Sequence, residues 1–172
     1  MNVLTLSFAG NTASALRIDL GGVSTVVIGN PAINDNAPST AAAKPARQRI
    51  NVPGGFIIVD HRAGLEWSHD LGDMTHAEGD AAAKACRLGG HEDWRLPTLD
   101  EQETNRDITR YNPACDPIFT DMKSSAYWTA SPVASYPDYA WIVYFDFGGA
   151  DICLRPLQCR VRAVRSVARA SQ

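Results

Sequence analysis

Residues 89–98 read Gly-Gly-His-Glu-Asp-Trp-Arg-Leu-Pro-Thr, and they separate the two helices that the sequence predicts. Glycine is favoured directly after a helix, so the paired glycines end a predicted helix over residues 77–88. Its start is marked by Thr75 and Glu78, whose spacing is that of a capping box. The stretch therefore predicts where the first helix ends and where the second begins.

The two predicted helices differ in the faces that they offer for packing. The first is rich in alanine, and Ala81 and Ala85 are expected to let it lie close against a sheet. The second begins at another capping box, formed by Thr98 and Glu101. It is short and unusually polar, and it offers few apolar side chains for burial.

The rest of the main domain is predicted to be strands and loops. Several segments are short apolar runs or alternate apolar with polar residues, the period of a half-buried strand. These segments are residues 56–59, 65–67, 127–128, 141–147 and 159–165. Gly148-Gly149 predicts a turn. Trp94, Trp128 and Trp141 are expected to fill a small core between helices and sheet.

Charged residues limit the kinds of partner that we expect. The formal net charge is −3, which argues against a nucleic-acid partner, because phosphate binding requires a basic face. Arg95 is expected to pair with a carboxylate or with carbonyl groups. The arginines near the C-terminus are interpreted as the solvated face of a strand: Arg155, Arg160, Arg162, Arg165 and Arg169.

Composition is that of an ordinary soluble globular protein, with 45% hydrophobic and 20% charged residues. No run approaches the roughly 18 apolar residues of a membrane span, so no membrane insertion is expected. The N-terminus lacks the basic region of a secretory signal peptide, so none is predicted there.

Three segments of different composition predict the domain organisation. Residues 1–30 alternate apolar and polar side chains between Gly-containing turns, which predicts a β-meander. So short a piece buries little core alone, so it is expected to serve docking or oligomerisation. Residues 31–48 are rich in proline and small residues and predict a linker. Residues 49–168 form the predicted ligand-binding domain.

Five short sequence motifs, in this order, carry a family resemblance. They are residues 63–67 (Ala-Gly-Leu-Glu-Trp), 89–98, 127–131 (Tyr-Trp-Thr-Ala-Ser), 140–145 (Ala-Trp-Ile-Val-Tyr-Phe) and 159–165 (Cys-Arg-Val-Arg-Ala-Val-Arg). They resemble the family named after the C-terminal domain of the Legionella collagen-like adhesin, a branch of the C-type-lectin-like fold. The resemblance implies an α+β, C-type-lectin-like domain with two helices packed on small antiparallel sheets with long loops.

The sequence departs from the family pattern in two respects. Family members usually carry leucines in the second helix, where this chain has Gln102 and Asn105, so that helix is expected to be distorted or to face a partner. The sequence motifs that bind calcium and sugar in true C-type lectins are absent. Calcium-dependent sugar binding is therefore not inferred from the resemblance.

Four cysteines permit three pairings. The resemblance implies disulfides from Cys86 to Cys159 and from Cys115 to Cys153, and disulfides imply a location outside the reducing cytosol. Four reduced, buried cysteines are the alternative. No cofactor and no metal site are predicted. A structural calcium is left open but unsupported, because carboxylates in loops are usually just solvated; the aspartates considered are Asp116, Asp121, Asp138, Asp146 and Asp151.

The resemblance places the ligand face on the loop after the Tyr127-Trp128 strand and on the hairpin that follows. Tyrosine and serine on a proline-stiffened loop suit binding, because tyrosine gives contact area at little entropy cost. The candidate ligand-binding residues are Ser131, Ser135, Tyr136, Asp138, Tyr139, Tyr144, Asp146, Asp151 and Arg155.

The sequence predicts a non-enzymatic receptor-binding protein of a phage or prophage tail, located in the virion, that recognises the bacterial host surface. Its expected partners are a host cell-surface glycan or protein and, through the N-terminal segment, other tail proteins. A homo-oligomer is expected, with a trimer as one arrangement. The alternative is a secreted or surface adhesin that binds glycans or glycosaminoglycans. A third reading is an enzyme related to the formylglycine-generating branch of the fold, which needs reactive cysteines near a cleft.

Overall fold

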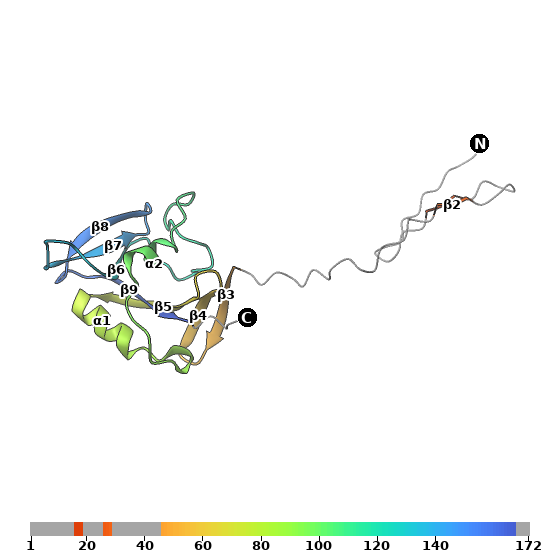
Figure 1. Cartoon of the computed structure of the whole chain (residues 1–172). Coiled ribbons are helices and arrows are strands. Elements are labelled where there is room, and N and C mark those ends of the chain that lie inside the picture. Colours follow the sequence, from red (N-terminus) through yellow and green to blue (C-terminus); the bar gives the residue numbers. More distant parts are fainter. Residues whose placement is uncertain (1–15, 19–25, 29–45, 168–172) are drawn as a thin grey trace. The chain divides into compact units, whose positions relative to one another are not determined.

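The computed structural model describes residues 16–18, 26–28 and 46–167, and the chain divides into two units, residues 1–43 and 44–172 (Figure 1). In the first unit, strands β1 (Leu16–Ile18) and β2 (Val26–Ile28) pair antiparallel. The remainder of the predicted meander, and residues 31–45 of the predicted linker, lie outside the described residues.

The second unit is built on one seven-stranded sheet with the order β3-β4-β5-β9-β6-β7-β8. Its strands are β3 (Arg47–Val52), β4 (Gly55–Asp60), β5 (Leu65–Met74), β6 (Ala126–Pro132), β7 (Tyr139–Tyr144), β8 (Gly149–Leu154) and β9 (Cys159–Ser166). Arg47 and Gln48, which the sequence assigned to the linker, lie in β3. That edge strand was missed because all five of its residues before Val52 are polar or exposed.

The sheet is continuous because β6 lies parallel to β9, with Tyr127 opposite Arg160. Every other neighbouring pair of strands in this sheet is antiparallel. The last strand of the chain therefore lies in the middle of the sheet, between a meander formed by β3, β4 and β5 and a second formed by β6, β7 and β8.

The expected fold class is wrong. The structure is mostly a seven-stranded mixed sheet with two short α-helices, 15% helical and 43% strand, and not a C-type-lectin-like α+β domain in which helices pack on small separate sheets. The physical reason lies in the helices, which have only ten and five residues: α1 (His76–Ala85) and α2 (Leu99–Glu103). The parallel contact between β6 and β9 then merges what were expected to be separate sheets.

Both capping boxes are confirmed. The side chains of Thr75 and Thr98 each accept a hydrogen bond from the backbone N–H three residues later, and Glu78 and Glu101 return the contact. The first helix ends at Ala85, three residues before the predicted end. A short 3-10 turn, η1 (Leu88–Gly90), follows, with Gly89 at φ 65°, a conformation that favours glycine.

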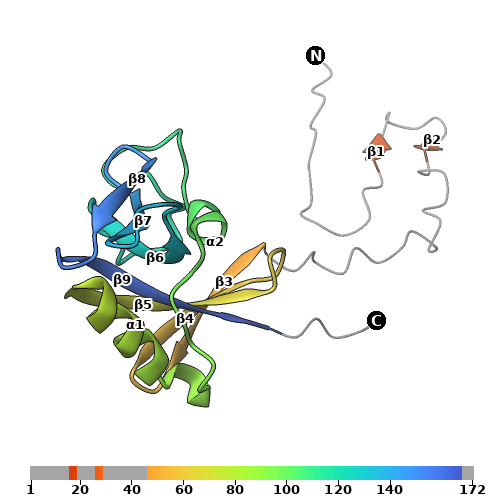
Figure 2. The same cartoon turned by 60° about the vertical axis from the view of Figure 1, so that its left-hand side comes forward.

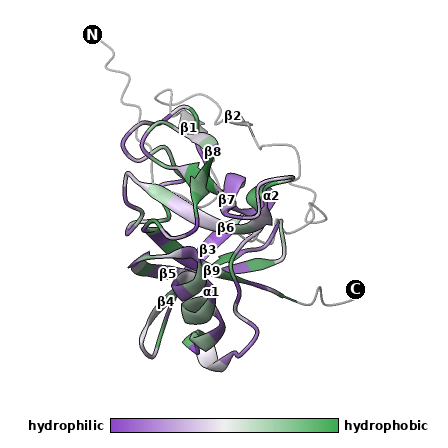
Figure 3. Ribbon diagram, turned by 90° about the vertical axis from the view of Figure 1, so that its left-hand side faces the viewer, coloured by the Kyte–Doolittle hydropathy of each residue, from purple (hydrophilic) through white to green (hydrophobic). Residues whose placement is uncertain are grey.

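Two hydrophobic cores lie on opposite faces of the sheet, because successive residues of a strand point to opposite sides. In β9, Val161 and Ala163 belong to the first core and Val164 to the second. Helix α1 covers the first core together with Trp94, whereas Leu99 of α2 packs against the second. Figure 2 shows the two helices on different parts of the sheet, and α2 appears largely purple in the hydropathy colours of Figure 3.

Helix α1 contacts the sheet through Gly79 and Ala83, which are buried. A Cβ added to Gly79 would lie 2.7 Å from a methyl carbon of Val161, so the helix backbone approaches β9 very closely. Ala81 and Ala85, the residues expected to make this contact, are exposed. The close approach of helix and sheet was expected, but the helix makes it through the face of Gly79 and Ala83 and not through the face of Ala81 and Ala85.

The tryptophan core is confirmed for Trp94 and Trp128, which are buried, whereas Trp141 is only half-buried. The interpretation of the C-terminal arginines as a solvated face is wrong for Arg162. Its guanidinium is completely buried and donates to the Ser68 carbonyl and to Asp121, 2.6 Å away. The neighbouring arginines of β9 form ion pairs: Arg160 with Asp70 and Asp73, and Arg165 with Glu66 and Asp93.

Candidate ligand-binding surface

The segment between β6 and β7 presents an exposed tyrosine. This segment, together with Tyr139, the first residue of β7, is called the tyrosine loop below (residues 133–139). Tyr136 is 58% exposed, and its ring meets the half-buried ring of Tyr139 edge to face at 6.0 Å. Ser135 has a φ of 66°, in the left-handed region that few residues other than glycine adopt. The loop thus displays one aromatic ring supported by a second.

Arg155 fixes the tyrosine loop to the rest of the domain. Its Nε donates to the carbonyl oxygens of Pro137 at 2.9 Å and Tyr139 at 3.1 Å. Its backbone N–H donates to the carbonyl of Asp138 at 2.9 Å. One residue of the turn between β8 and β9 therefore holds three successive backbone carbonyls of the loop.

His76 lies behind Arg155 and fixes its guanidinium. Nη1 of Arg155 lies 2.9 Å from Nδ1 of the imidazole, whose Nε2 lies 3.0 Å from the carbonyl oxygen of Thr129. The imidazole ring also packs edge to face on Trp128, at 5.2 Å. Burial, reinforced by the Arg155 charge, lowers the pKa of His76, although the Thr129 carbonyl opposes the shift.

Only some of the predicted site residues lie together. Five of them meet at the open end of the β7–β8 hairpin, where Tyr139 pairs with Leu154. They are Ser135, Tyr136, Asp138, Tyr139 and Arg155. Tyr144 and Asp146 lie at the opposite end, five residues along β7, which is roughly 17 Å away at the rise of a strand. Asp151 is exposed on the edge strand β8, between the two ends. Ser131 faces inward, where its hydroxyl accepts a hydrogen bond from the Leu99 backbone N–H.

The far end of the hairpin carries an apolar surface that the sequence analysis missed. Phe147 is 59% exposed and stacks on Tyr144 at 5.3 Å. Tyr111, on a neighbouring loop, is 77% exposed, and the Asn112 N–H donates to the carbonyl of Asp146. The alternating pattern placed Phe147 inside a strand, but β7 ends at Tyr144. The Gly148-Gly149 turn directly after Phe147 is the signal that could have placed it at an exposed tip.

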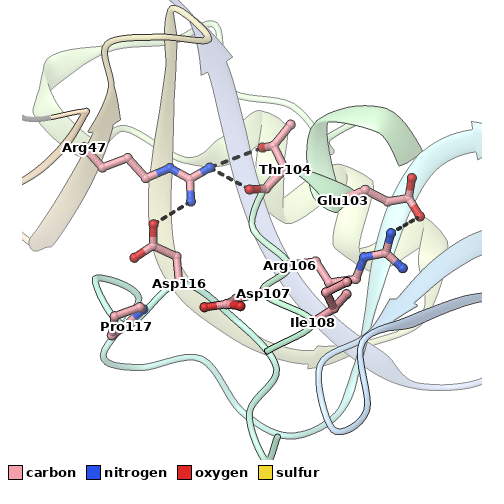
Figure 4. Close-up of a pocket in the computed structure, with 8 residues that line it drawn as sticks. All are labelled: Arg47, Glu103, Thr104, Arg106, Asp107, Ile108, Asp116 and Pro117. Atoms are coloured by element: carbon pink, nitrogen blue, oxygen red, sulfur yellow. Dashed lines mark hydrogen bonds and ion pairs between the residues drawn. The ribbon is translucent and has the colours of Figure 1, made fainter. Parts of the chain in front are cut away.

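A polar pocket of about 490 Å³ lies between β3 and the segment that follows α2 (Figure 4). Arg47 reaches into it and donates to Asp60, Asp116 and both oxygens of Thr104. Arg106 lies across the pocket, 3.4 Å from Glu103 (Figure 4). These contacts occupy every nitrogen of the Arg47 guanidinium and fasten β3 to the segment that follows α2.

The four cysteines are free thiols, so neither expected disulfide is present in residues 46–167. Cys115 belongs to the second core, on the opposite face of the sheet from Cys153, which explains why those two do not meet. Cys86, Cys153 and Cys159 all contact the first core, and the sulfur atoms of Cys153 and Cys159 lie 3.9 Å apart.

Among the described residues no group of three or more metal-binding side chains is close enough to hold an ion. Two of the five aspartates considered for calcium are paired with arginines, Asp116 with Arg47 and Asp121 with Arg162. No helix in the part of the chain that the structure describes is long and apolar enough to cross a membrane.

A comparison with known protein families gives the same family as the five sequence motifs. The family model described as the Lcl C-terminal domain matches residues 56–165, well over half of the chain. The chain therefore belongs to this family, which confirms the resemblance. Membership supports an adhesin-like surface protein and favours the adhesin alternative over the phage-tail reading. No curated protein matches the chain.

Proposed function

We propose that this protein is a non-enzymatic, adhesin-like binding domain that contacts a cell-surface glycan through the tyrosine loop. The observation that carries the proposal is the exposed ring of Tyr136 on a loop whose backbone Arg155 holds at three carbonyls. A loop that is ordered before binding loses little entropy on binding. Tyrosine combines an apolar face with a hydroxyl, which suits the mixed surface of a sugar ring.

The side chains around Tyr136 fit such a ligand. Asp138 is exposed and supplies carboxylate oxygens that accept hydrogen bonds from sugar hydroxyls. Ser135 is exposed beside it and both donates and accepts. Family membership adds support for a role at a surface. The phage-tail role and the trimer stay predictions, for which no contact among the described residues gives support.

A catalytic role is not part of the proposal. The cysteine-based alternative needs a thiolate, but burial raises the pKa of Cys115 to about 11. Burial, followed by the nearby Cys153 thiol, raises the pKa of Cys159 to about 12. Both thiols are therefore protonated near neutral pH and are poor nucleophiles.

The test is binding to a panel of immobilised bacterial and host glycans and to intact bacterial cells, with purified full-length protein. Tyr136→Ala is expected to weaken binding at least about tenfold, the effect of losing one anchoring aromatic side chain. Tyr111→Ala is the matched control, because this exposed tyrosine lies at the other end of the hairpin. Equal binding by the wild type and Tyr136→Ala, with a loss in Tyr111→Ala, would move the site to the far end.

A further inference from the structure

We propose that His76 and Arg155 act together as a proton-controlled support of the tyrosine loop, so that protonation of His76 releases the loop from its binding shape. Only the consequence for ligand binding rests on the proposed function. The release of the loop is a property of the contacts themselves and can be measured without a ligand.

The hydrogen-bond pattern fixes the protonation state of His76. An arginine guanidinium has donors and no acceptor, so Nδ1 must accept the hydrogen bond from Nη1 of Arg155 at 2.9 Å. The proton of the neutral ring then sits on Nε2, which donates to the carbonyl of Thr129 at 3.0 Å. Both ring nitrogens are thereby satisfied only in one neutral tautomer.

A second proton on the ring would break this arrangement. It would go to Nδ1, where an N–H would face the N–H of Arg155, and two positive charges would be in contact. The guanidinium must then move away. Because Nε of the same guanidinium holds the carbonyls of Pro137 and Tyr139, its movement removes those two contacts from the loop.

The charged groups around the ring allow this response. Arg155 faces His76 from the turn between β8 and β9, and Asp80 faces it from one turn further along α1. Strand β6 offers neutral groups, the Thr129 carbonyl and the Trp128 ring. Burial and the Arg155 charge favour the neutral ring, whereas the Thr129 carbonyl and Asp80 favour the charged one. The net effect is a lowered pKa, so the support is intact at neutral pH and is lost on acidification.

The loop has few other ties of its own. Within it, the Tyr136 N–H donates to Val133 and the Tyr139 N–H donates to Tyr136. The backbone N–H of Arg155 still holds Asp138 after the guanidinium moves. Protonation is therefore expected to loosen residues 133–139 locally and to leave the sheet intact.

Hydrogen–deuterium exchange of the full chain tests this directly. Corrected for intrinsic exchange rates, amides of residues 133–139 are expected to lose about tenfold protection between about pH 7 and about pH 4.5. This range extends well below the usual histidine pKa of 6.5 because the pKa of His76 is lowered. Amides of β4 should keep their protection, which separates loop release from global unfolding. Unchanged loop protection in the wild type would overturn the proposal.

Variants assign the effect to the two residues. His76→Gln keeps one acceptor and one donor without a titrating group, so its loop protection should be independent of pH. Arg155→Lys lacks Nε, so its loop should be poorly protected at both pH values. His91→Gln is the matched control and should retain the wild-type response, because this ring lies 4.0 Å from Glu66, away from the loop. A pH response that persists in His76→Gln would contradict the proposal.

Nitrogen NMR of the wild-type His76 ring covers the case in which a variant fails to fold. The Nε2–H tautomer is expected near neutral pH, and loop amides should shift with the same midpoint as the ring. Different midpoints would count against the coupling. Binding to a glycan recovered from the panel should weaken about tenfold in acid for the wild type and for His91→Gln, but not for His76→Gln. If no glycan binds, the proposed function fails while the exchange result still stands or falls on its own.

Discussion

The amide of Gln102 is completely buried in the domain, and neither its nitrogen nor its oxygen has a hydrogen-bond partner. The same holds for the side chain of Asn105, one turn later. A buried amide without a partner costs about 1–3 kcal/mol. These two residues are therefore expected to lower the stability of the domain.

Replacing the amide should stabilise the protein. Gln102→Met keeps the length of the side chain and removes its polar atoms, so the free energy of unfolding is expected to rise by about 1–3 kcal/mol. Urea unfolding followed by tryptophan fluorescence measures the change. Gln48→Met, at an exposed position of β3, is the control and should change stability by less than about 0.5 kcal/mol. A destabilised Gln102→Met would indicate that the amide has a water partner.

Single residues were predictable where the cause is local. The pairs Thr75–Glu78 and Thr98–Glu101 lie three residues apart, so their spacing alone predicted the caps. Arg162 was not predictable in the same way, because its carboxylate partner, Asp121, lies 41 residues earlier in the chain. An arginine in a strand is usually solvated, and only the tertiary fold shows that this one is buried.

At the scale of elements, α1 and β9 touch at a point where there is no space for a side chain. Gly79→Ala would place a Cβ 2.7 Å from Val161, so we expect a loss of about 1–3 kcal/mol despite the better helix propensity of alanine. Thermal or urea unfolding measures the loss.

The partner residue supplies the control for this contact. Val161→Ala removes the methyl group that Gly79→Ala would meet, so the double variant should be more stable than the sum of the single effects predicts. Simple additivity of the two single changes would show that the helix shifts away from β9 instead of clashing with it.

The sequence predicted the existence of several helices and strands but not how the strands are arranged. Strands such as Gly55–Asp60 and Cys159–Ser166 carry their own hydrophobic pattern, and so does the first helix. The arrangement of the strands was not visible, because β6 and β9 meet through one parallel contact between Tyr127 and Arg160. No local pattern reports such a contact, and its omission led to the wrong fold class.

At the scale of the whole molecule, carboxylates paired with arginines link distant strands. Burial opposes ionisation of Asp70, but hydrogen bonds from Arg160 and Tyr127 outweigh it and lower its pKa below the usual 3.8. Burial likewise opposes ionisation of Asp60, and backbone N–H groups and Arg47 outweigh it, so its pKa is also lowered. The hydrogen bond from Arg95, the largest cause, lowers the pKa of Glu101.

Stability should therefore fall in acid. A carboxylate with a lowered pKa in the folded state stabilises fully above its unfolded value, and this contribution is lost as pH falls through the folded value. His76 adds an earlier loss below its usual 6.5, because the unfolded chain binds that proton more readily. Urea midpoints measured from about pH 7 to about pH 3 should fall in both windows.

Two variants separate the windows. His76→Gln should remove the loss of stability in the histidine window, just below about pH 6.5, and leave the loss in the carboxylate window unchanged. Asp70→Asn should be less stable at neutral pH but lose less on going below about pH 4, because the titrating carboxylate is gone. An Asp70→Asn profile parallel to the wild type would show that this carboxylate does not contribute to the acid response.

The candidate site was predicted in part at this scale. The exposed position of Tyr136 follows from a proline-containing loop between two strands, which the sequence shows. The separation of Tyr144 from Tyr136 depends on the register of the β7–β8 hairpin. The contact of Arg155 with His76 joins residues 79 apart in sequence, and no pattern predicted it.

The place of β3 determines how the domain would carry a mechanical load. Among the described strands, the edge strand β3 pairs with β4 alone, beginning with Arg47 opposite Asp60. A pull from that side on a surface-bound molecule would peel β3 away one residue pair at a time. The Arg47 guanidinium, held by Asp60, Asp116 and Thr104, would bear the tension first and delay that unzipping.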